Sequence, residues 1–160
     1  MKRVRGIALF VGLLLIVFGM QTYADNLDTW IDESYVAYIN KVCDEKGLCP
    51  EFVEALVEAE SSGKAGVVSS GGCVGLTQMS PSNRFSAGKN LYDPYQNIDA
   101  GTDFLIYLFE EYSDPGVVLV AYNTGEHSQA TKNAINNGEL NAYAKKILKR
   151  AETLERVHGK

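Results

Sequence analysis

Apolar residues recur at intervals of three and four along almost the whole chain, and this helical period limits the fold more than any other feature of the sequence. Five stretches carry the period: 27–42, 50–60, 98–112, 117–122 and 140–154. The interruption is residues 61–80, which are rich in Gly and Ser and hold two short β-like runs, Val67-Val68 and Cys73-Val74. The pattern predicts a mostly α-helical chain with one small irregular or β-hairpin insertion, and it argues against a large sheet.

Helix-start signals fit these stretches. Asp25 or Asn26 is the expected cap of the first helix, and Pro50 suits the first position of the second. Asn97 is the expected cap of the third helix, and Asp114 stands as cap before a proline at the start of the fourth.

The first 24 residues have the features of a secretory signal peptide. Three basic residues precede an apolar run, Ile7–Met20, and a small residue, Ala24, follows it at the position where cleavage would occur. The run is shorter than the ~20 residues of a membrane-spanning helix. We therefore expect an exported protein (periplasm, cell wall or extracellular) with a single domain over 25–160 and no stable membrane anchor after cleavage. The alternative is an uncleaved anchor.

The charge of the chain restricts its partners. The chain has 15 basic and 20 acidic residues, and the first 24 positions hold three of the basic ones and no acid, so 12 against 20 remain, a net charge of −8. Such an acidic domain is a poor nucleic-acid binder, whereas a sugar chain is compatible with it. His127 and His158 have no second ligand at metal spacing, so we predict no metal site and no cofactor.

Three cysteines remain after the apolar run, Cys43, Cys49 and Cys73. Export permits disulfides, and the short polar turn between the first two predicts a Cys43–Cys49 bond. Cys73 is expected to be a small buried hydrophobe.

Glu60 is the residue of greatest chemical interest. It follows Val53 by seven positions and Leu56 by four, which places it on the apolar face of the second helix, in its last turn. Burial and the helix dipole both favour the protonated carboxyl, the form that a general acid needs. The alternative is that Glu60 simply ends an amphipathic helix, like three glutamates expected on or near its polar side: Glu51, Glu54 and Glu58.

Four motifs occur in a fixed order around this glutamate. They are Glu60-Ser61, Gly75-Leu76-Thr77-Gln78-Met79, Asn97-Ile98 with Gly101, and Ala121-Tyr122-Asn123-Thr124-Gly125. Together they closely resemble the catalytic domain of the soluble lytic transglycosylases, lysozyme-like enzymes that cut peptidoglycan, over about residues 48–150. The family pattern is E-S, G-L-M-Q, N-I-x-x-G and A-Y-N-A-G. Thr77 and Thr124 depart from it, and the segment Pro81–Asn90 is shorter than the family's helix there.

The resemblance implies an α+β lysozyme-like fold and a role for each matched residue. Glu60 would be the single catalytic acid/base. The residues implied to contact the sugar chain are Ser61, Gln78, Tyr122, Asn123 and Tyr143. Ser61 has an alternative as an ordinary helix-end hydroxyl, and Tyr143 has one as a core residue, because it stands at core spacing with Ile147.

The activity that the resemblance implies is cleavage of the β-1,4 bond between N-acetylmuramic acid and N-acetylglucosamine, with a 1,6-anhydromuramyl end as product. One alternative is a muramidase of the same fold, which would need a second carboxylate; the candidates are Asp93, Asp99 and Asp103, and we predict that none reaches Glu60. The other is a non-catalytic peptidoglycan-binding domain of an envelope-spanning assembly. The expected partner is the peptidoglycan glycan strand, within a secretion, conjugation or phage assembly.

Overall fold

The computed structural model describes residues 28–160, and this range is mostly helical, as predicted. Its helices are α2 (Glu33–Lys46), α3 (Pro50–Ser61), the short 3-10 helix η1 (Arg84–Ser86), α4 (Pro94–Tyr112), α5 (Pro115–Thr124), α6 (Gln129–Asn137) and α7 (Ala142–Val157). None of the helices in 28–160 combines the length and apolar character needed to cross a membrane. The expected signal peptide and the two expected caps Asp25 and Asn26 lie outside the described residues.

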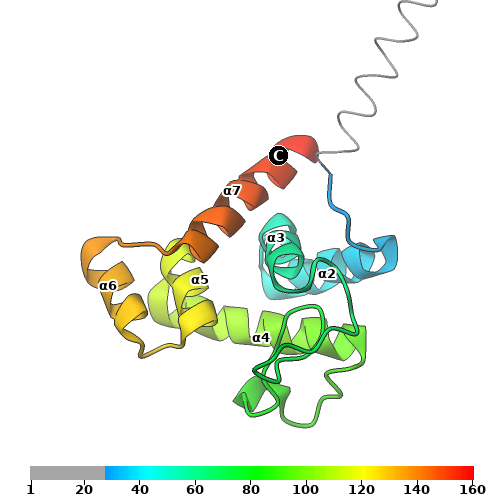
Figure 1. Cartoon of the computed structure of the whole chain (residues 1–160). Coiled ribbons are helices and arrows are strands. Elements are labelled where there is room, and N and C mark those ends of the chain that lie inside the picture. Colours follow the sequence, from blue (N-terminus) through cyan, green and yellow to red (C-terminus); the bar gives the residue numbers. More distant parts are fainter. Residues whose placement is uncertain (1–27) are drawn as a thin grey trace, which may run out of the picture.

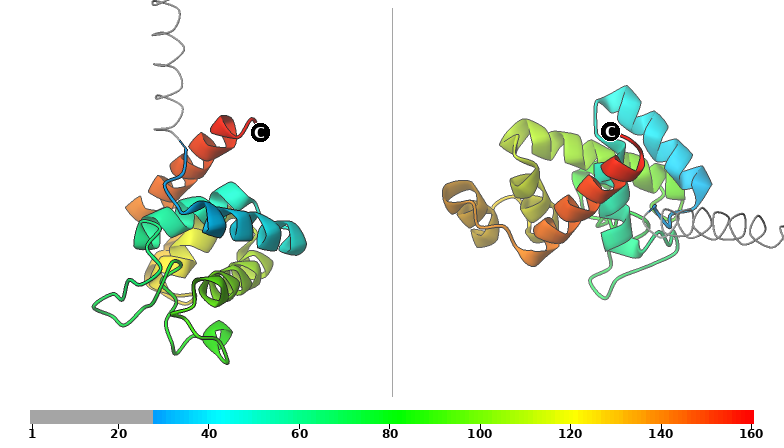
Figure 2. Two further views of the ribbon diagram at one scale, coloured as in Figure 1. Left: turned by 90° about the vertical axis from the view of Figure 1, so that its right-hand side faces the viewer. Right: turned by 90° about the horizontal axis from the view of Figure 1, so that it is seen from above.

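Helix α3 lies at the centre of the molecule. It packs against α7 on one side and α2 on the other, while α5 contacts α4, α6 and α7. In Figure 1 the long helix α4 runs below α3 and α7 crosses above it, and Figure 2 shows α7 from above, lying across the other helices. The C-terminus lies beside the start of the described chain (Figure 1), where His158 contacts Asp28.

Two helix starts differ from the prediction. The first helix begins at Glu33 rather than near residue 27, because Asp32 accepts a hydrogen bond from the amide of Ser34 and caps it. Helix α4 begins at Pro94 and is capped by Asp93, whose carboxylate accepts from two amides of the first turn, so Asn97 is not the cap. Helix α6 was not predicted, since its residues are polar and Thr131 and Ala134 are its buried ones.

The segment after α3 forms a small hairpin, as predicted. Val74 makes isolated antiparallel bridges with Val68 and with Met79, and the described residues contain no longer strand. Gln78 sits in this turn with a left-handed backbone (φ 49°). The insertion is therefore a compact loop attached to the helical body.

The buried side chain of Asn97 fastens this loop to α4. Its Oδ1 accepts from the Thr77 amide at 2.9 Å, and its Nδ2 donates to the carbonyls of Val74 at 2.8 Å and Leu91 at 3.0 Å. Both ends of the amide are thus satisfied by loop backbone, which fixes the loop relative to the helix.

Two glycines allow this close approach. A Cβ on Gly75 would lie 2.3 Å from Nδ2 of Asn97, and a Cβ on Gly101 would lie 2.7 Å from Cβ of Thr77. Gly75 also has a positive φ of 80°. The N-I-x-x-G motif therefore serves loop docking, because the asparagine bonds the loop and the glycine leaves room for it.

The expected polar face of α3 is buried, which corrects the sequence-based assignment. Glu51 and Glu54 are each 1% exposed, and Glu58 is 5% exposed. The start of the described chain, α7 and the residues after α7 cover them: the Thr29 hydroxyl donates to Glu58 at 2.8 Å, Arg150 Nε lies 2.6 Å from Glu58, and Lys160 Nζ lies 2.8 Å from Glu51. Sequence periodicity could not show this, because the cover comes from distant segments.

Glu54 differs from the other two buried glutamates of α3, Glu51 and Glu58. Neither of its carboxyl oxygens has a hydrogen-bond partner in residues 28–160. Burial raises the pKa of Glu54 to about 7 against an ordinary value of 4.5, and the charge of His158 opposes this rise only in part. Glu54 is thus a buried carboxyl that retains its proton to nearly neutral pH.

The structure contradicts the predicted Cys43–Cys49 disulfide, because all three cysteines are free thiols. Cys43 is buried in the core, whereas Sγ of Cys49 lies 3.3 Å from Glu51 and 3.4 Å from Glu155. The Cys49 thiol thus contacts two carboxylates. Cys73 is partly buried.

Candidate active site

The Glu60 carboxyl lies in the last turn of α3, just before the left-handed residue Ser62 that ends the helix. It is partly buried, and the Tyr143 hydroxyl donates a hydrogen bond to its Oε1. Burial raises the pKa of Glu60 above its ordinary value, while the bond from Tyr143 acts in the opposite direction. The expected rise in the pKa of Glu60 is confirmed, and it favours the protonated acid.

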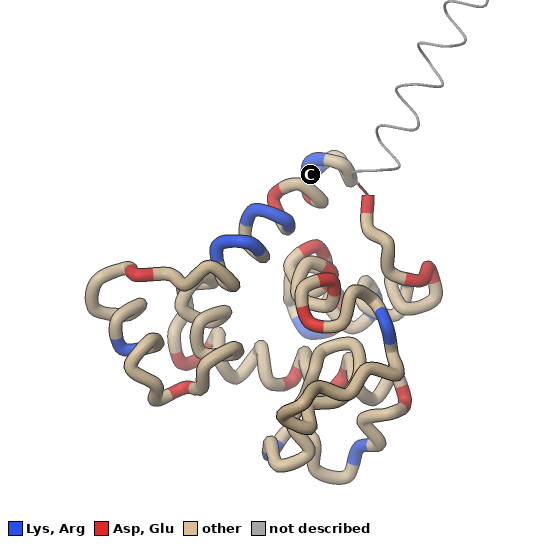
Figure 3. Tube along the Cα trace, in the orientation of Figure 1, with Lys and Arg blue, Asp and Glu red and all other residues tan. Residues whose placement is uncertain are grey.

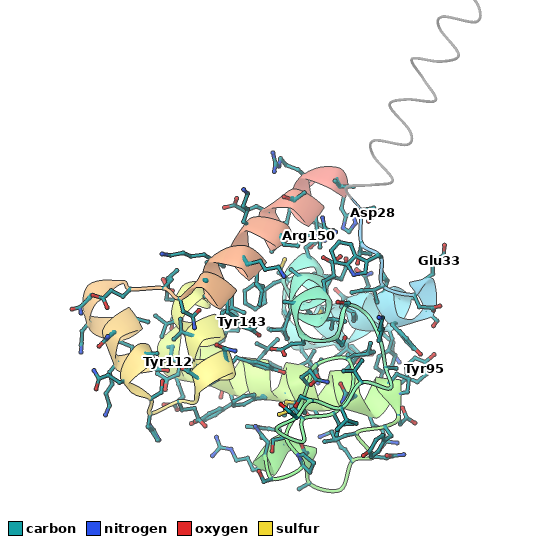
Figure 4. The ribbon with its side chains drawn as sticks, in the orientation of Figure 1. Asp28, Glu33, Tyr95, Tyr112, Tyr143 and Arg150 are labelled. Carbon is teal, nitrogen blue, oxygen red and sulfur yellow. The ribbon has the colours of Figure 1, made fainter. Side chains whose placement is uncertain are left out.

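Tyr143 comes from the first turn of α7, and Figure 4 shows it close to α3. Asn141 caps this helix by accepting from the Ala144 amide at 2.9 Å, and its own side-chain amide donates to Asn123 of α5 at 3.3 Å. The sequence left two roles open for Tyr143, contact with the sugar chain and packing in the core; the structure places its hydroxyl on Glu60.

Tyr122 connects the site to the hairpin loop. Its hydroxyl donates to the Thr77 carbonyl at 2.8 Å and contacts Sδ of Met79 at 3.4 Å, and its ring packs against Phe104 with centroids 5.2 Å apart. Burial raises the pKa of Tyr122, and the nearby Glu60 charge raises it further. Glu60, Tyr122 and Tyr143 therefore form one cluster.

Gln78 lies in the loop, and its side chain supports the turn. Its Nε2 donates to the carbonyls of Val67 at 3.1 Å and Gly75 at 2.9 Å. Among residues 28–160 it makes no hydrogen bond to Glu60. Its Oε1 is the atom left to accept from a ligand.

The positions of Ser61 and Asn123 give weaker support for contact with a sugar chain. Ser61 is buried and its hydroxyl donates to the Val57 carbonyl at 3.1 Å, which favours the alternative of an ordinary helix-end hydroxyl. Asn123 is exposed, and its Oδ1 accepts from Asn141. Sequence reasoning missed Asn141, although an asparagine two residues before a helical tyrosine is a recognisable cap signal.

The three candidate second carboxylates are all engaged elsewhere. Asp93 caps α4, Asp99 accepts from a tyrosine of α2 at 3.1 Å, and Asp103 contacts two lysines at 2.6 and 3.1 Å. The groups in residues 28–160 that shift the pKa of Glu60 include no other carboxylate. The site thus offers one carboxyl, held by a tyrosine, for both proton donation and proton acceptance.

Comparison with known proteins agrees with this geometry. The family model described as "Transglycosylase SLT domain" matches residues 37–145. A transglycosylase of Enterobacteria phage PRD1 is 34% identical over 67% of this chain and 39% of its own length. Membrane-bound lytic murein transglycosylase C of Actinobacillus pleuropneumoniae serotype 5b is 29% identical, over 57% of this chain and 30% of its own length. The chain thus spans well under half of these relatives.

Two solved structures share the fold. The 70 kDa soluble lytic transglycosylase of Escherichia coli has a TM-score of 0.65 at 22% identity, covering 78% of this chain and 24% of that one. An inactive mutant of lytic transglycosylase Slt from Pseudomonas aeruginosa has a TM-score of 0.60 at 20% identity, covering 75% and 24%. The lysozyme-like fold class expected from the sequence is confirmed.

Proposed function

Because the chain belongs to the transglycosylase SLT domain family, we propose that it is a peptidoglycan lytic transglycosylase with Glu60 as its catalytic acid and base. The observation that carries the proposal is the partly buried Glu60 carboxyl, which has a raised pKa and accepts a hydrogen bond from Tyr143. The relatives named above are transglycosylases, and one is named for murein, the peptidoglycan of the cell wall.

In the first step the protonated Glu60 donates its proton to the oxygen of the β-1,4 bond between N-acetylmuramic acid and N-acetylglucosamine. The bond from this oxygen to the muramyl C1 breaks, and the N-acetylglucosamine chain leaves with the new hydroxyl. The substrate's own N-acetyl group stabilises the positive charge at C1. The Tyr143 hydrogen bond then stabilises the carboxylate that forms on Glu60.

In the second step the Glu60 carboxylate accepts the proton of the muramyl 6-hydroxyl, whose oxygen bonds to C1. This closes the 1,6-anhydro ring and restores the acid without water. Hydrolysis by a muramidase would instead need a carboxylate to activate water, ~6.5–9.5 Å from the acid in inverting enzymes and ~5–5.5 Å in retaining ones. The engagement of the three aspartates elsewhere supports the anhydro product.

The place of action follows from the substrate. Peptidoglycan lies outside the cell membrane, so the proposal includes export. The basic and apolar start of the sequence, which resembles a signal peptide, supports this part of the proposal. The phage relative favours a setting in which an assembly must pass a cell wall, such as phage entry, secretion or conjugation. Gln78, Tyr122 and Asn123 are proposed to contact the glycan strand.

The test compares the wild type, Glu60→Gln and the control Glu45→Gln, an exposed glutamate of α2. Purified cell walls are digested, and the soluble products are weighed by mass spectrometry. We expect anhydromuramyl products, lighter by one water than hydrolysed ones, from the wild type and the control, and none from Glu60→Gln. Hydrolysed products would favour the muramidase, and equal lysis by Glu60→Gln would end the proposal. If none of the proteins lyses walls but all sediment with them, the binding-domain alternative is correct.

A further inference from the structure

A cavity of about 250 Å³ lies along the contact between α3 and α7, next to the candidate active site. Its walls include Ala59, the neighbour of Glu60 in the chain, and Lys146, which follows Tyr143 by three residues on α7. Residues three apart on a helix lie on the same side, ~4.5 Å apart along the axis. The cavity therefore begins within one helical turn of the Glu60–Tyr143 pair.

Basic residues predominate among the charged residues that line the cavity. Lys146, Lys149 and Arg150 line it, with Glu58 as the acid among its walls. Arg150 Nε is bound to Glu58 at 2.6 Å, so these two charges offset each other. Lys146 and Lys149 are exposed and form no ion pair within residues 28–160. Two cationic side chains are thus available on a protein whose net charge is −5, and Figure 3 shows the basic positions gathered along α7.

An exposed aromatic side chain completes the wall. Trp30 is 59% exposed, and its ring lies 4.9 Å from the Arg150 guanidinium. Its backbone packs beside Gly63, just beyond the end of α3. The contact with Arg150 holds the ring in place while much of its surface faces solvent. An apolar surface beside two free ammonium groups suits a ligand that is extended, partly apolar and anionic.

We propose that this cavity, whose walls include Trp30, Lys146 and Lys149, binds the acidic peptide attached to the muramyl sugar of the substrate. The inference rests on the proposed function, because that function places the muramyl residue at Glu60. The peptide carries free carboxylates, which Lys146 and Lys149 would bind, and short apolar side chains, which would contact Trp30.

The spacing agrees with this assignment. Lys146 and Lys149 lie ~4.5 and ~9 Å beyond Tyr143 along α7. An extended peptide advances ~3.3 Å per residue, so carboxylates one to three residues from the sugar reach both ammonium groups. The peptide-bearing sugar would thereby be held in place by a part of the substrate that does not react, a use of remote binding energy in catalysis.

The test uses Lys146→Glu/Lys149→Glu and a matched control, Lys145→Glu, an exposed residue of the same helix outside the cavity wall. Each protein digests intact peptidoglycan and peptidoglycan whose peptides an amidase has removed. The ratio of the two initial rates should fall at least tenfold in the double variant and stay unchanged in the control. Equal loss on both substrates, or no loss on either, would overturn the proposal.

A binding measurement separates this proposal from the proposed function. The free acidic peptide, released by the same amidase, is titrated into each protein in a calorimeter at low and at moderate salt. We expect binding by the wild type and the control that weakens with salt, and at least tenfold weaker binding by the double variant and by Trp30→Ala. Equal binding by all four, or none by the wild type, contradicts the peptide site. Binding without any glycan cleavage would contradict the proposed catalysis alone.

Discussion

Replacing Glu54 by glutamine should make the folded protein less sensitive to rising pH. Glu54 is 1% exposed in α3, and neither of its oxygens has a partner within residues 28–160. Burial is the main reason that its pKa is raised to about 7; Glu51, Asp28 and Glu58 add to the rise and His158 opposes it. The glutamine variant has the same shape and no charge to bury.

The magnitude follows from the two pKa values. Below about pH 4.5 the Glu54 carboxyl is protonated in both the folded and unfolded chains, so it adds no pH dependence. Between about pH 4.5 and pH 7 the unfolded chain releases this proton and the folded chain keeps it, so the free energy of unfolding falls as pH rises. At ~1.4 kcal/mol per pKa unit, the total loss above pH 7 is roughly 3 kcal/mol.

Urea unfolding at a series of pH values from 4.5 to 8 measures this effect. The free energy of unfolding of Glu54→Gln, minus that of the wild type, should grow by roughly 3 kcal/mol across the range. His158 and Glu51 titrate in both proteins and largely cancel from this difference. Asp44→Asn, which removes an exposed carboxylate of α2, is the control for the loss of a carboxylate as such.

A difference for Glu54→Gln that stays constant with pH would refute the reasoning. It would mean that the Glu54 carboxyl ionises at its ordinary pKa in the folded protein, and hence that water or a cation reaches it. A difference that shrinks with rising pH would mean that the ionised form is stabilised.

Three further outcomes are expected. Tyr143→Phe removes the hydrogen bond that stabilises the Glu60 carboxylate, so kcat/KM on cell walls should fall about ten- to a hundredfold. Because this bond lowers the pKa of Glu60, the pH profile of kcat/KM should shift to higher pH; an unchanged profile would exclude a role of Tyr143 in positioning Glu60. Asn97→Ala leaves loop groups without partners and should lower the free energy of unfolding by ~3 kcal/mol or more, measured in urea; a loss below ~1 kcal/mol would show that the loop docks without it. Titration of the unfolded, non-reduced protein with a thiol reagent should find three thiols, whereas a single thiol would restore the Cys43–Cys49 bond.

The parts of the fold that the sequence predicted are those set by local signals. Pro50 and the Asp114–Pro115 pair mark the starts of α3 and α5, and the apolar stripe identified Glu60 as a residue on an inward face. The parts that it did not predict depend on distant contacts. The sequence pattern assigned Glu54 to the polar surface, because nothing in α3 itself shows that α7 and the start of the described chain cover this face.

The residues of the candidate site likewise fall into those that local sequence signals predicted and those that depend on distant contacts. The sequence motifs grouped Glu60 and Tyr122 as residues of one site. The hydrogen bond from Tyr143 to Glu60 could not be predicted in this way, because it depends on how α7 packs on α3. Asn97 was expected to cap a helix, an ordinary role for asparagine. Its actual partners are loop carbonyls and an amide that only the folded chain brings to it.

The attachment of the loop at Asn97 has a consequence for how the segment between the hairpin and α4 can vary in length. The same side chain bonds the backbone at Val74 and at Leu91, so the chain between the hairpin and α4 leaves and returns at one point. Insertions between two fixed ends are entropically inexpensive, since doubling such a loop costs only ~0.6 kcal/mol. Residues 81–90 are therefore a place where this fold tolerates added or deleted segments without moving Gln78 or Glu60.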